Sequence, residues 1–317
     1  MRVLIAVDET HSSDATIESV VKHRWPVGTQ FHLISAAHPA PFEMDGHTLR
    51  AEHELLARFS AELTERANGR VAWTECLEGS AKKIILDAAE ATSADLIVVG
   101  AHNERGIERL ILGNVSQSIL EHAPCPVLVV RDCDPQGSLA FKRILFPIDG
   151  SPCSQLALDW LFTQDWSADT EFLFVHVAAQ EISSKFERED IEQAMADLER
   201  QSNADNKLEA DIEKALSELT PKLCSYKHSV EALRGEPAEQ ILLFASQWQS
   251  DLIVMGSHGR TGLQKALLGS VSLTVASRAV CSVLIVKQRV RIEPSTKIPE
   301  DYYNDSDSPH SVAPTML

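Results

Sequence analysis

A long internal repeat is the feature that most constrains how this chain can fold. The segment RVLIAVD at residues 2–8 matches RILFPID at residues 143–149, at an offset of 141 residues (149 − 8). Farther along, ADLIVVG at residues 94–100 matches SDLIVMG at residues 250–256, at an offset of 156 residues (256 − 100). Two copies of one unit, each of ordinary domain size, predict two domains with the same fold.

The two offsets differ, so the second copy contains an insertion of 15 residues (156 − 141). It must lie between Val177 and Leu233, because the matches on either side of that interval keep their own offsets. Within the interval, residues 185–218 are rich in charged and helix-favouring side chains. We expect a solvated helix face here, since closely spaced charges of both signs are more typical of such a face than of an acidic metal site.

Both copies alternate short apolar, β-branched runs with longer amphipathic stretches, which is the pattern of a parallel sheet covered by helices. The strands expected in the second copy are Ile144–Ile148, Phe172–Val177, His228–Leu233, Leu252–Met255 and Val283–Val286, and the first copy repeats them around Val3, Phe31, Val71, Leu96 and Val127. Helices are expected at about residues 153–165, 236–248 and 270–279. The predicted fold class is α/β, with two tandem doubly wound domains that each hold a five-stranded parallel sheet.

Two stretches without this periodicity mark the predicted domain boundaries. Residues 133–140 contain Asp, Pro, Gly and Ser and indicate a short linker. Residues 290–317 are rich in Pro, Ser and Asp and lack a core-forming pattern, so we expect a disordered tail there. The predicted domains are accordingly residues 1–132 and residues 142–289.

The charge balance argues against one class of partner. With 29 basic and 46 acidic residues the formal net charge is −17, and no basic stripe in the sequence could replace counterions on a nucleic-acid backbone. We therefore expect neither nucleic acid nor an anionic membrane surface as a partner. The apolar run 3–7 ends at Asp8, which makes it too short for a signal-peptide core or a membrane span, and we expect a cytoplasmic protein.

Six cysteines are scattered along the chain without a CxxC pair. That spacing and density are not those of a disulfide framework, so reduced thiols are expected. Cys125 and Cys281 stand just before apolar runs, where a thiol is usually a small buried hydrophobe.

Two loops of the second copy follow predicted strands at the edge where open α/β sheets bind ligands. One is PIDGS at residues 147–151, and the other carries the pattern G-x2-G-x9-G-S over residues 256–270 and runs into a predicted helix. Glycines permit positive φ and a close backbone approach, while a hydroxyl and helix N-terminal amides bind anions. Arg260 and Lys265 make the loop positive, with no acidic residue from 257 to 268, which suits a polyphosphate.

With these motifs the chain resembles the universal stress protein family, and the resemblance extends from Arg2 to about Lys287. It implies a Rossmann-like fold of the adenine nucleotide α hydrolase type, with ATP or another adenine nucleotide, carrying Mg²⁺ in some cases, in the second copy. By that resemblance, adenine and ribose would face Pro147, Asp149 and Val177, and ribose and phosphates would face Gly256, Gly259, Gly269, Ser270, Val271 and Ser272. The predicted site also includes Met255, His258, Arg260 and Gly262.

The family further implies that the last strands of two domains pair across a two-fold axis. In a tandem chain, the strands at residues 127–130 and 283–286 can make that contact internally. We therefore expect an intramolecular pseudo-dimer, with any homodimer built from a different surface.

The first copy departs from the loop pattern at four positions. Asn103, Asn114, Ala6 and Glu9 stand where the second copy has Gly259, Ser270, Pro147 and Gly150. Its loop also balances two acidic residues against two basic ones, so that the net charge of the loop is lost. Asn accepts left-handed backbone geometry better than other non-glycine residues, so the turn can survive while phosphate binding weakens. We expect the first copy to be a structural or partner-binding half.

The histidines are further candidates for functional groups. His258 is interpreted as a hydrogen-bond donor beside phosphate rather than as an acid or base. His38, His47 and His53 do not have the helical spacing of metal ligands.

Trp25 and Trp166 occupy equivalent positions and are expected to pack at helix ends. Ser151 and Ser154 suit a helix start and not a nucleophile.

Three functions remain open at this stage. The first is a non-enzymatic, nucleotide-dependent stress regulator in which ATP occupancy changes association. The second is an enzyme that slowly hydrolyses ATP or transfers an adenylyl group, although the Ser-Gly-Gly-x-Asp-Ser and His-x-Gly-His signatures of such enzymes are missing from the first strand end. The third is an interaction module that keeps the loop only for folding.

Overall fold

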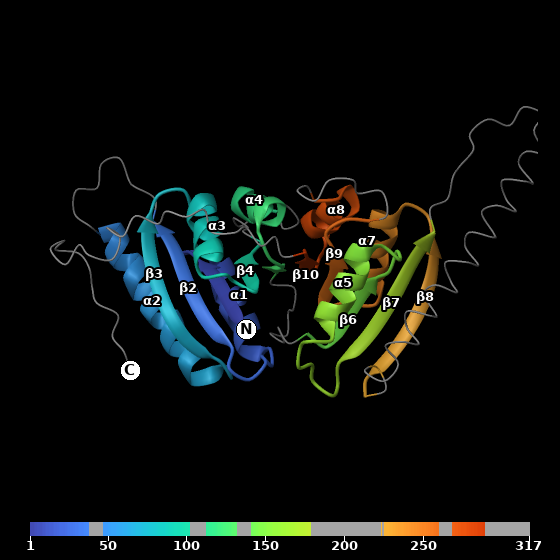
Figure 1. Ribbon diagram of the computed structural model, residues 1–317, viewed down its shortest axis with the longest axis horizontal. Coiled ribbons are helices and arrows are strands. Elements are labelled where there is room, and N and C mark those ends of the chain that lie inside the picture. Colours follow the sequence, from blue (N-terminus) through green and yellow to red (C-terminus); the bar gives the residue numbers. More distant parts are fainter. Residues whose placement is uncertain are drawn as a thin grey trace, which may run out of the picture.

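The computed structural model describes residues 1–37, 47–101, 112–131, 141–178, 223, 225–259 and 268–288. Two α/β halves lie side by side and contribute strands to one central sheet (Figure 1). The predicted linker, charged insertion and tail fall outside the described residues, so those three expectations stay predictions.

The first half alternates strands and helices from its first residues. In chain order its elements are β1 (Arg2–Val7), α1 (His11–Lys22), β2 (Gln30–Ala37), α2 (His47–Arg66), β3 (Arg70–Glu78), α3 (Ala81–Ala91), β4 (Leu96–Gly100), α4 (Asn114–His122) and β5 (Val127–Val130).

The second half repeats this plan. Its elements are β6 (Arg143–Pro147), α5 (Pro152–Leu161), β7 (Glu171–Ala178), β8 (Lys227–Arg234), α7 (Pro237–Gln247), β9 (Leu252–Gly256), α8 (Ser270–Arg278) and β10 (Ser282–Val286). All five predicted strands are present with ends within one residue of those expected. Helix α5 stops earlier than expected, because the N–H of Thr163 donates to the carbonyl of Trp160, three residues back (3.0 Å). The indole of Trp166 then donates to the carbonyl of Leu161 (2.7 Å), which would accept from the N–H of residue 165 in a longer helix.

The sheet has the strand order β3-β2-β1-β4-β5-β10-β9-β6-β7-β8. Pairing within each half is parallel, which confirms the predicted α/β, doubly wound fold class. The halves are joined by one antiparallel pair, β5 with β10, in which Leu284 lies opposite Leu128. This pair confirms the predicted contact between the last strands of the two halves. It also means that neither β5 nor β10 is left as an unpaired edge of the sheet.

Alternate residues of the strands enter two cores, one on each face of the sheet. In β1, Val3 and Ile5 pack with α1 and α2, whereas Leu4 packs with α3 and α4. Both cores continue through the second half, where α5 lies on the first face and α7 and α8 on the second. The carboxyl ends of the central strands therefore open between two helical layers in each half.

The two halves also touch through the end of α1. His23 is 9% exposed and packs edge-on against Trp166 of the second half, with ring centroids 5.1 Å apart. Trp25 and Trp166 are both buried, which confirms their predicted packing role at helix ends.

Each half also caps a helix of the other. The guanidinium of Arg131, which follows β5, donates to two carbonyl oxygens at the end of α8, at 2.7 and 3.1 Å. The ammonium of Lys287, which follows β10, donates to two carbonyl oxygens at the end of α4, at 3.0 and 3.5 Å. A helix C-terminus favours positive charge, so this exchange stabilises the junction.

Cys125 and Cys281 are buried next to β5 and β10, each with 1% exposure. The four described cysteines are free thiols, which agrees with the reduced state expected. Cys133 and Cys224 lie outside the described residues.

Candidate functional site

In the second half, the loop after β6 presents the carboxylate of Asp149. Its Oδ1 accepts a hydrogen bond from the backbone N–H of Ser151 (3.0 Å). Gly150 lies between them in the left-handed region, with φ of 72°, where a side chain would be strained. The sequence Asp-Gly-Ser thus forms a tight turn that places a carboxylate at the edge of the sheet.

Ser151 links this turn to α5 and to the loop after β9. Its Oγ accepts from the N–H of Ser154 (3.1 Å) and donates to the carbonyl oxygen of His258 (3.3 Å). The predicted helix-start role of both serines is confirmed, since Ser151 is the N-cap of α5. The hydroxyl of Ser151 also holds the two loops of the candidate site together.

Backbone hydrogen bonds hold together the two ends of the loop that follows β9. The N–H of Ser257 donates to the carbonyl of Val286 (3.0 Å), and the N–H of Gly269 donates to the carbonyl of Ser257 (2.8 Å). The chain from residue 260 to 267 starts and ends at this closure but lies outside the described residues. Arg260 and Gly262 belong to that stretch, so their predicted roles stay predictions.

The described glycines of this loop serve close packing and not unusual dihedral angles. Of the two properties that favour glycine here, positive φ is not used, because Gly256, Gly259 and Gly269 do not adopt it. A Cβ on Gly256 would lie 2.6 Å from the backbone of α5, and one on Gly259 would lie 2.9 Å from Oδ2 of Asp149. A Cβ on Gly269 would lie 3.2 Å from the carbonyl oxygen that its own N–H binds. Only glycine lets these segments approach so closely.

The N-terminus of α8 lies at the same closure. Gly269 is its N-cap, and Ser270 is exposed in the first turn together with half-buried Val271. The first amides of a helix have no intrahelical acceptor and carry a partial positive charge, which makes them suited to bind an anion.

Ser272 is buried instead, and its Oγ donates to the carbonyl of Gly256 (2.9 Å). This bond gives Ser272 a role in positioning α8, and its contact with a ligand stays a prediction.

The apolar residues of the predicted site lie at or near the ends of three neighbouring strands. Pro147 closes β6, Val177 is half-buried near the end of β7, and Met255 is buried near the end of β9. Since β6 pairs with both β7 and β9, the three side chains belong to one edge of the sheet. The structure therefore brings the described members of the predicted site to one place.

His258 is the titratable side chain of this loop. Burial, and then the positive charge of Lys287, lower the pKa of His258 below its ordinary value. Its Nδ1 lies 3.1 Å from Oγ of Ser257, and its Nε2 is shielded from water with no hydrogen-bond partner among the described residues. A lowered pKa makes the imidazole a weaker base, in line with the interpretation of His258 as a hydrogen-bonding group.

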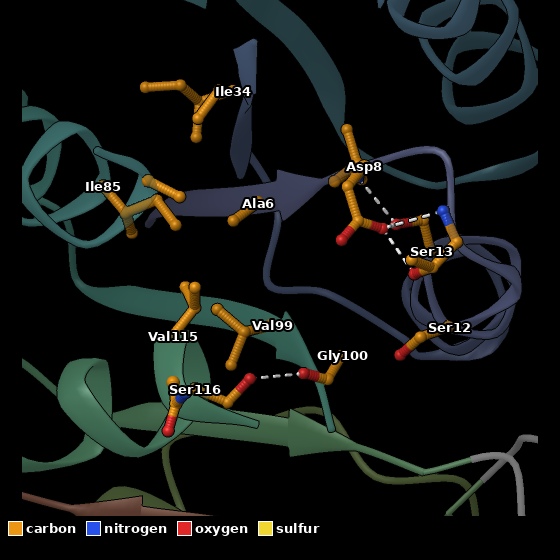
Figure 2. A pocket seen from close by; sticks show the side chains of 15 residues that line it. Ala6, Asp8, Ser12, Ser13, Ile34, Ile85, Val99, Gly100, Val115 and Ser116 are labelled. Atoms are coloured by element: carbon orange, nitrogen blue, oxygen red, sulfur yellow. Dashed lines mark hydrogen bonds between the residues drawn. The ribbon is translucent and has the colours of Figure 1, made fainter. Parts of the chain in front are cut away.

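The equivalent edge of the first half surrounds a cavity of about 290 Å³ (Figure 2). Its apolar wall is formed by Ala6 of β1, Ile34 of β2, Ile85 of α3, Val99 of β4 and Val115 of α4. The sequence did not predict this cavity, because its wall consists of apolar strand and helix residues that no motif marks. The retained Asp8, at the position of Asp149, was the one available signal.

Asp8 forms the polar end of the cavity and is held more tightly than Asp149. Its Oδ1 accepts from the N–H of Thr10 (3.0 Å) and from Oγ of Ser13 (2.8 Å), and also from the hydroxyl of Thr10. Because that hydroxyl is used in this way, Thr10 makes no side-chain cap on α1, unlike Ser151 on α5.

A second acidic group, Glu52 on α2, is buried near this end of the sheet. It is 6% exposed and accepts a hydrogen bond from the hydroxyl of Ser35. Burial raises the pKa of Glu52, and the nearby charges of Glu9 and Asp8 raise it further, against the lowering effect of the Ser35 bond. No sequence pattern marked Glu52, because its burial results from the packing of α2 on β2.

The described residues contain no group of three or more His, Cys, Asp or Glu side chains placed to hold a metal ion. His38 and the side chain of His47 lie outside them, so the expectation about the three histidines is not tested. Of the helices in the described ranges, none is long and apolar enough to span a membrane.

Known proteins resemble both halves. The model of the universal stress protein family matches residues 1–131 and again residues 140–287. A universal stress protein of Mycolicibacterium smegmatis is 30% identical over 300 residues, which cover 90% of this chain and 97% of that protein.

Two solved structures share the fold. A universal stress protein from Archaeoglobus fulgidus superposes with a TM-score of 0.59 at 18% identity, covering 91% of this chain and 96% of that one. A functionally unknown protein from Pseudomonas aeruginosa superposes with a TM-score of 0.58 at 16% identity, covering 91% and 92%. With one family model matched twice and a relative matched along almost its whole length, this chain belongs to the universal stress protein family and contains two such domains in tandem.

Proposed function

We propose that the second half binds ATP or a related adenine nucleotide, and that occupancy of this site changes how the protein associates with itself or with partners during stress. The observation that carries the proposal is the convergence of three groups at one edge of the sheet. They are the carboxylate of Asp149, the backbone at Gly259 that approaches this carboxylate closely, and the N-terminus of α8.

The phosphates would bind at the α8 N-terminus. The amides of its first turn and the exposed Ser270 hydroxyl offer donors to an anion, and Gly269 keeps the backbone accessible there. Arg260 would add a positive charge, with Mg²⁺ carried on the phosphates. The short contact between Gly259 and Asp149 supports a site in which backbone, and not side chains, lines the phosphate path.

The adenosine part would bind against the strand ends. Pro147, Val177 and Met255 provide apolar surface there, and the carboxylate of Asp149 can accept hydrogen bonds from ribose hydroxyls. Apolar surface with a few polar groups is the usual composition of a small-molecule site.

Regulation and not catalysis is the proposed output. A general base works best when its pKa is near the operating pH, whereas burial and Lys287 both lower the pKa of His258. The site lies next to the junction of the halves, since Ser257 binds the backbone of Val286 and Lys287 caps α4. Val286, which binds the loop, directly precedes Lys287, which binds the end of α4. A nucleotide that moves the loop would therefore also move this contact between the halves.

Calorimetric titration of ATP into the full chain tests the proposal, and we expect one site per chain. The variant Gly269→Val with Ser270→Ala should weaken binding by roughly a hundredfold or more, because it removes two phosphate contacts that are each worth about 1.5 to 3 kcal/mol.

The matched variant in the first half, Gly113→Val with Asn114→Ala, should leave ATP affinity unchanged. Two equivalent ATP sites would contradict the assignment to the second half. Absence of binding, together with no nucleotide released from denatured protein in mass spectrometry, would favour the interaction module.

A further inference from the structure

The two halves hold their equivalent aspartates in different ways, and the difference centres on His176 of β7. We propose that His176 is a positioning residue for Asp149, and that it thereby gives the second half a preference for ligands that carry ribose hydroxyls. This selectivity rests on the proposed function of the second half, because it concerns the same nucleotide site.

The imidazole of His176 binds the backbone directly before Asp149. Its Nδ1 lies 3.0 Å from the carbonyl oxygen of Ile148 and donates to it, because a carbonyl oxygen only accepts. His176 is 4% exposed and Ile148 is 6% exposed, so the bond is shielded from solvent. The carbonyl of Ile148 and the N–H of Asp149 belong to one planar peptide unit, so a bond to the first orients the second. His176 therefore sets the direction in which the chain enters Asp149.

The other ring nitrogen of His176 adds nothing to this bonding. Nε2 is buried and has no hydrogen-bond partner within the part of the chain that the structure describes. A buried polar atom without a partner is a cost to folding, so an apolar side chain would serve a purely structural role better. The bond from Nδ1 to Ile148 is the described interaction that offsets this cost.

The position of the backbone matters for Asp149 because its carboxylate has few other contacts. Its Oδ1 accepts from the N–H of Ser151 (3.0 Å), and the described residues provide no second hydrogen bond to this carboxylate. Asp8, by contrast, accepts from the N–H of Thr10 and from the hydroxyls of Thr10 and Ser13. Side chains thus orient Asp8 directly, whereas Asp149 depends on the peptide before it and on the turn after it.

Sheet pairing differs between the halves at the same place. The ladder of β1 with β2 extends through Val7, whereas the ladder of β6 with β7 ends one position earlier, before Ile148. The imidazole of His176 binds Ile148 where that further pair would be. In the first half Ser35 stands at the position of His176, and its hydroxyl donates to Glu52 instead. The anchor before the aspartate is therefore a feature of the second half.

Calorimetric titration of ATP and of 2′,3′-dideoxy-ATP into the full chain tests the role of His176. The dideoxy nucleotide keeps the base and the phosphates and lacks both hydroxyls that Asp149 would bind. The unmodified chain should bind ATP about tenfold more tightly than the dideoxy nucleotide. In His176→Ser, ATP affinity should fall about tenfold and dideoxy-ATP affinity should stay within about twofold, so that the preference disappears. His176→Asn retains a side-chain donor and should keep the preference.

Two further variants separate positioning from general loosening of the strand. Phe174→Leu changes a buried side chain two positions earlier on the same face of β7. It should leave the preference unchanged, because loosening of the core acts on both nucleotides alike. Asp149→Ala should remove the preference, and adding His176→Ser to it should lower ATP affinity no further. Urea unfolding of each variant establishes that it is folded.

The contradicting results are distinct. Equal losses of ATP and dideoxy-ATP affinity in His176→Ser would show a merely structural role and overturn the assignment of His176, with the nucleotide site left in place. A preference retained in His176→Ser, or missing from the unmodified chain, would overturn it in the same way. Absence of ATP binding to the unmodified chain would overturn the proposed function and the assignment together.

Discussion

The two halves share their scaffold contacts and differ where a ligand would bind. At the amino ends of the strands, Asp95 accepts from the N–H of Arg2 (2.7 Å), and Asp251 accepts from the N–H of Arg143 (2.8 Å). At the start of the last helix, Ser116 donates to Gly100 just as Ser272 donates to Gly256. These pairs lie at equivalent positions, so the repeat preserves what holds each half together.

The equivalent aspartates at the carboxyl edge have different surroundings. Asp8 accepts from Thr10 and Ser13, whereas Asp149 binds one backbone N–H and lies against Gly259. The difference teaches that the residues around the candidate site can change in this chain while the fold stays the same. Sheet pairing and core packing do not depend on the loops at the carboxyl edge, so those loops can change without loss of the fold.

The junction also contains unequal partners at equivalent positions. His23 of the first half corresponds to Gln164 of the second, and Arg131 corresponds to Lys287. In both pairs one side chain can change its charge within an accessible pH range and the other cannot. Each pair therefore permits a matched experiment on the two halves.

The largest effect is expected at His23. Burial lowers its pKa to about 4, from 6.5. The unfolded chain then binds more protons than the folded chain between these values, so stability is present above pH 6.5 and falls as pH falls toward 4. The loss in the free energy of unfolding should be about 3 kcal/mol between pH 7 and pH 4.

Urea unfolding of the full chain and of His23→Gln at both pH values measures this loss. His23→Gln introduces the residue found at the equivalent position of the second half. It should remove the part of the pH dependence that comes from His23. An equal loss in both proteins would show that other groups are responsible and that His23 does not distinguish the halves.

A smaller effect is expected from Gly259→Asn, which installs the residue of the first half in the second. Its Cβ would lie 2.9 Å from the carboxylate of Asp149, so the loop must shift and the phosphate path narrows. We expect ATP affinity to fall roughly tenfold to a hundredfold, the equivalent of about 1.5 to 3 kcal/mol.

Calorimetry measures that affinity, and Asn103→Gly is the reverse control. It should not give the first half ATP affinity, because the acidic groups and Asn114 remain. Unchanged ATP affinity in Gly259→Asn would mean that this loop is not the site.

The smallest effect is expected at Lys287, whose pKa is lowered by burial to about 8 from 10.5. The unfolded chain binds more protons between these values, so the cost of burying the charge is present below pH 8 and disappears as pH rises. The free energy of unfolding should therefore rise by roughly 1 kcal/mol from pH 7 to pH 9.

Lys287→Met should remove this rise. Arg131→Met should keep it, because an arginine stays charged throughout this range. Denaturant unfolding of the three proteins at both pH values checks the prediction, and a rise retained in Lys287→Met would assign it to another group.

Much of the fold could be predicted from the sequence because its determinants are local or repeated. The predicted ends of the second-half strands lie within one residue of the observed ends. An apolar, β-branched run bounded by polar residues marks where a buried strand begins and ends. The pairing of β5 with β10 followed from the resemblance to the family, whose last strands pair, and from the presence of two such apolar strands in one chain. Helix α5 was predicted too long, because the bond from Trp166 to Leu161 joins residues through a turn that no helical pattern encodes.

The sequence predicts members of the candidate site but not the geometry that relates them. The sequence by itself determined two domains of one family, the loop pattern over residues 256–270 and the departures from it in the first half. Only the tertiary structure decided that the described loop glycines serve close packing, that Glu52 is buried with its carboxylate on Ser35 and that the first half keeps a cavity. These features depend on distances between segments far apart in the chain, and such distances are set by how helices pack on the sheet and not by any local pattern of residues.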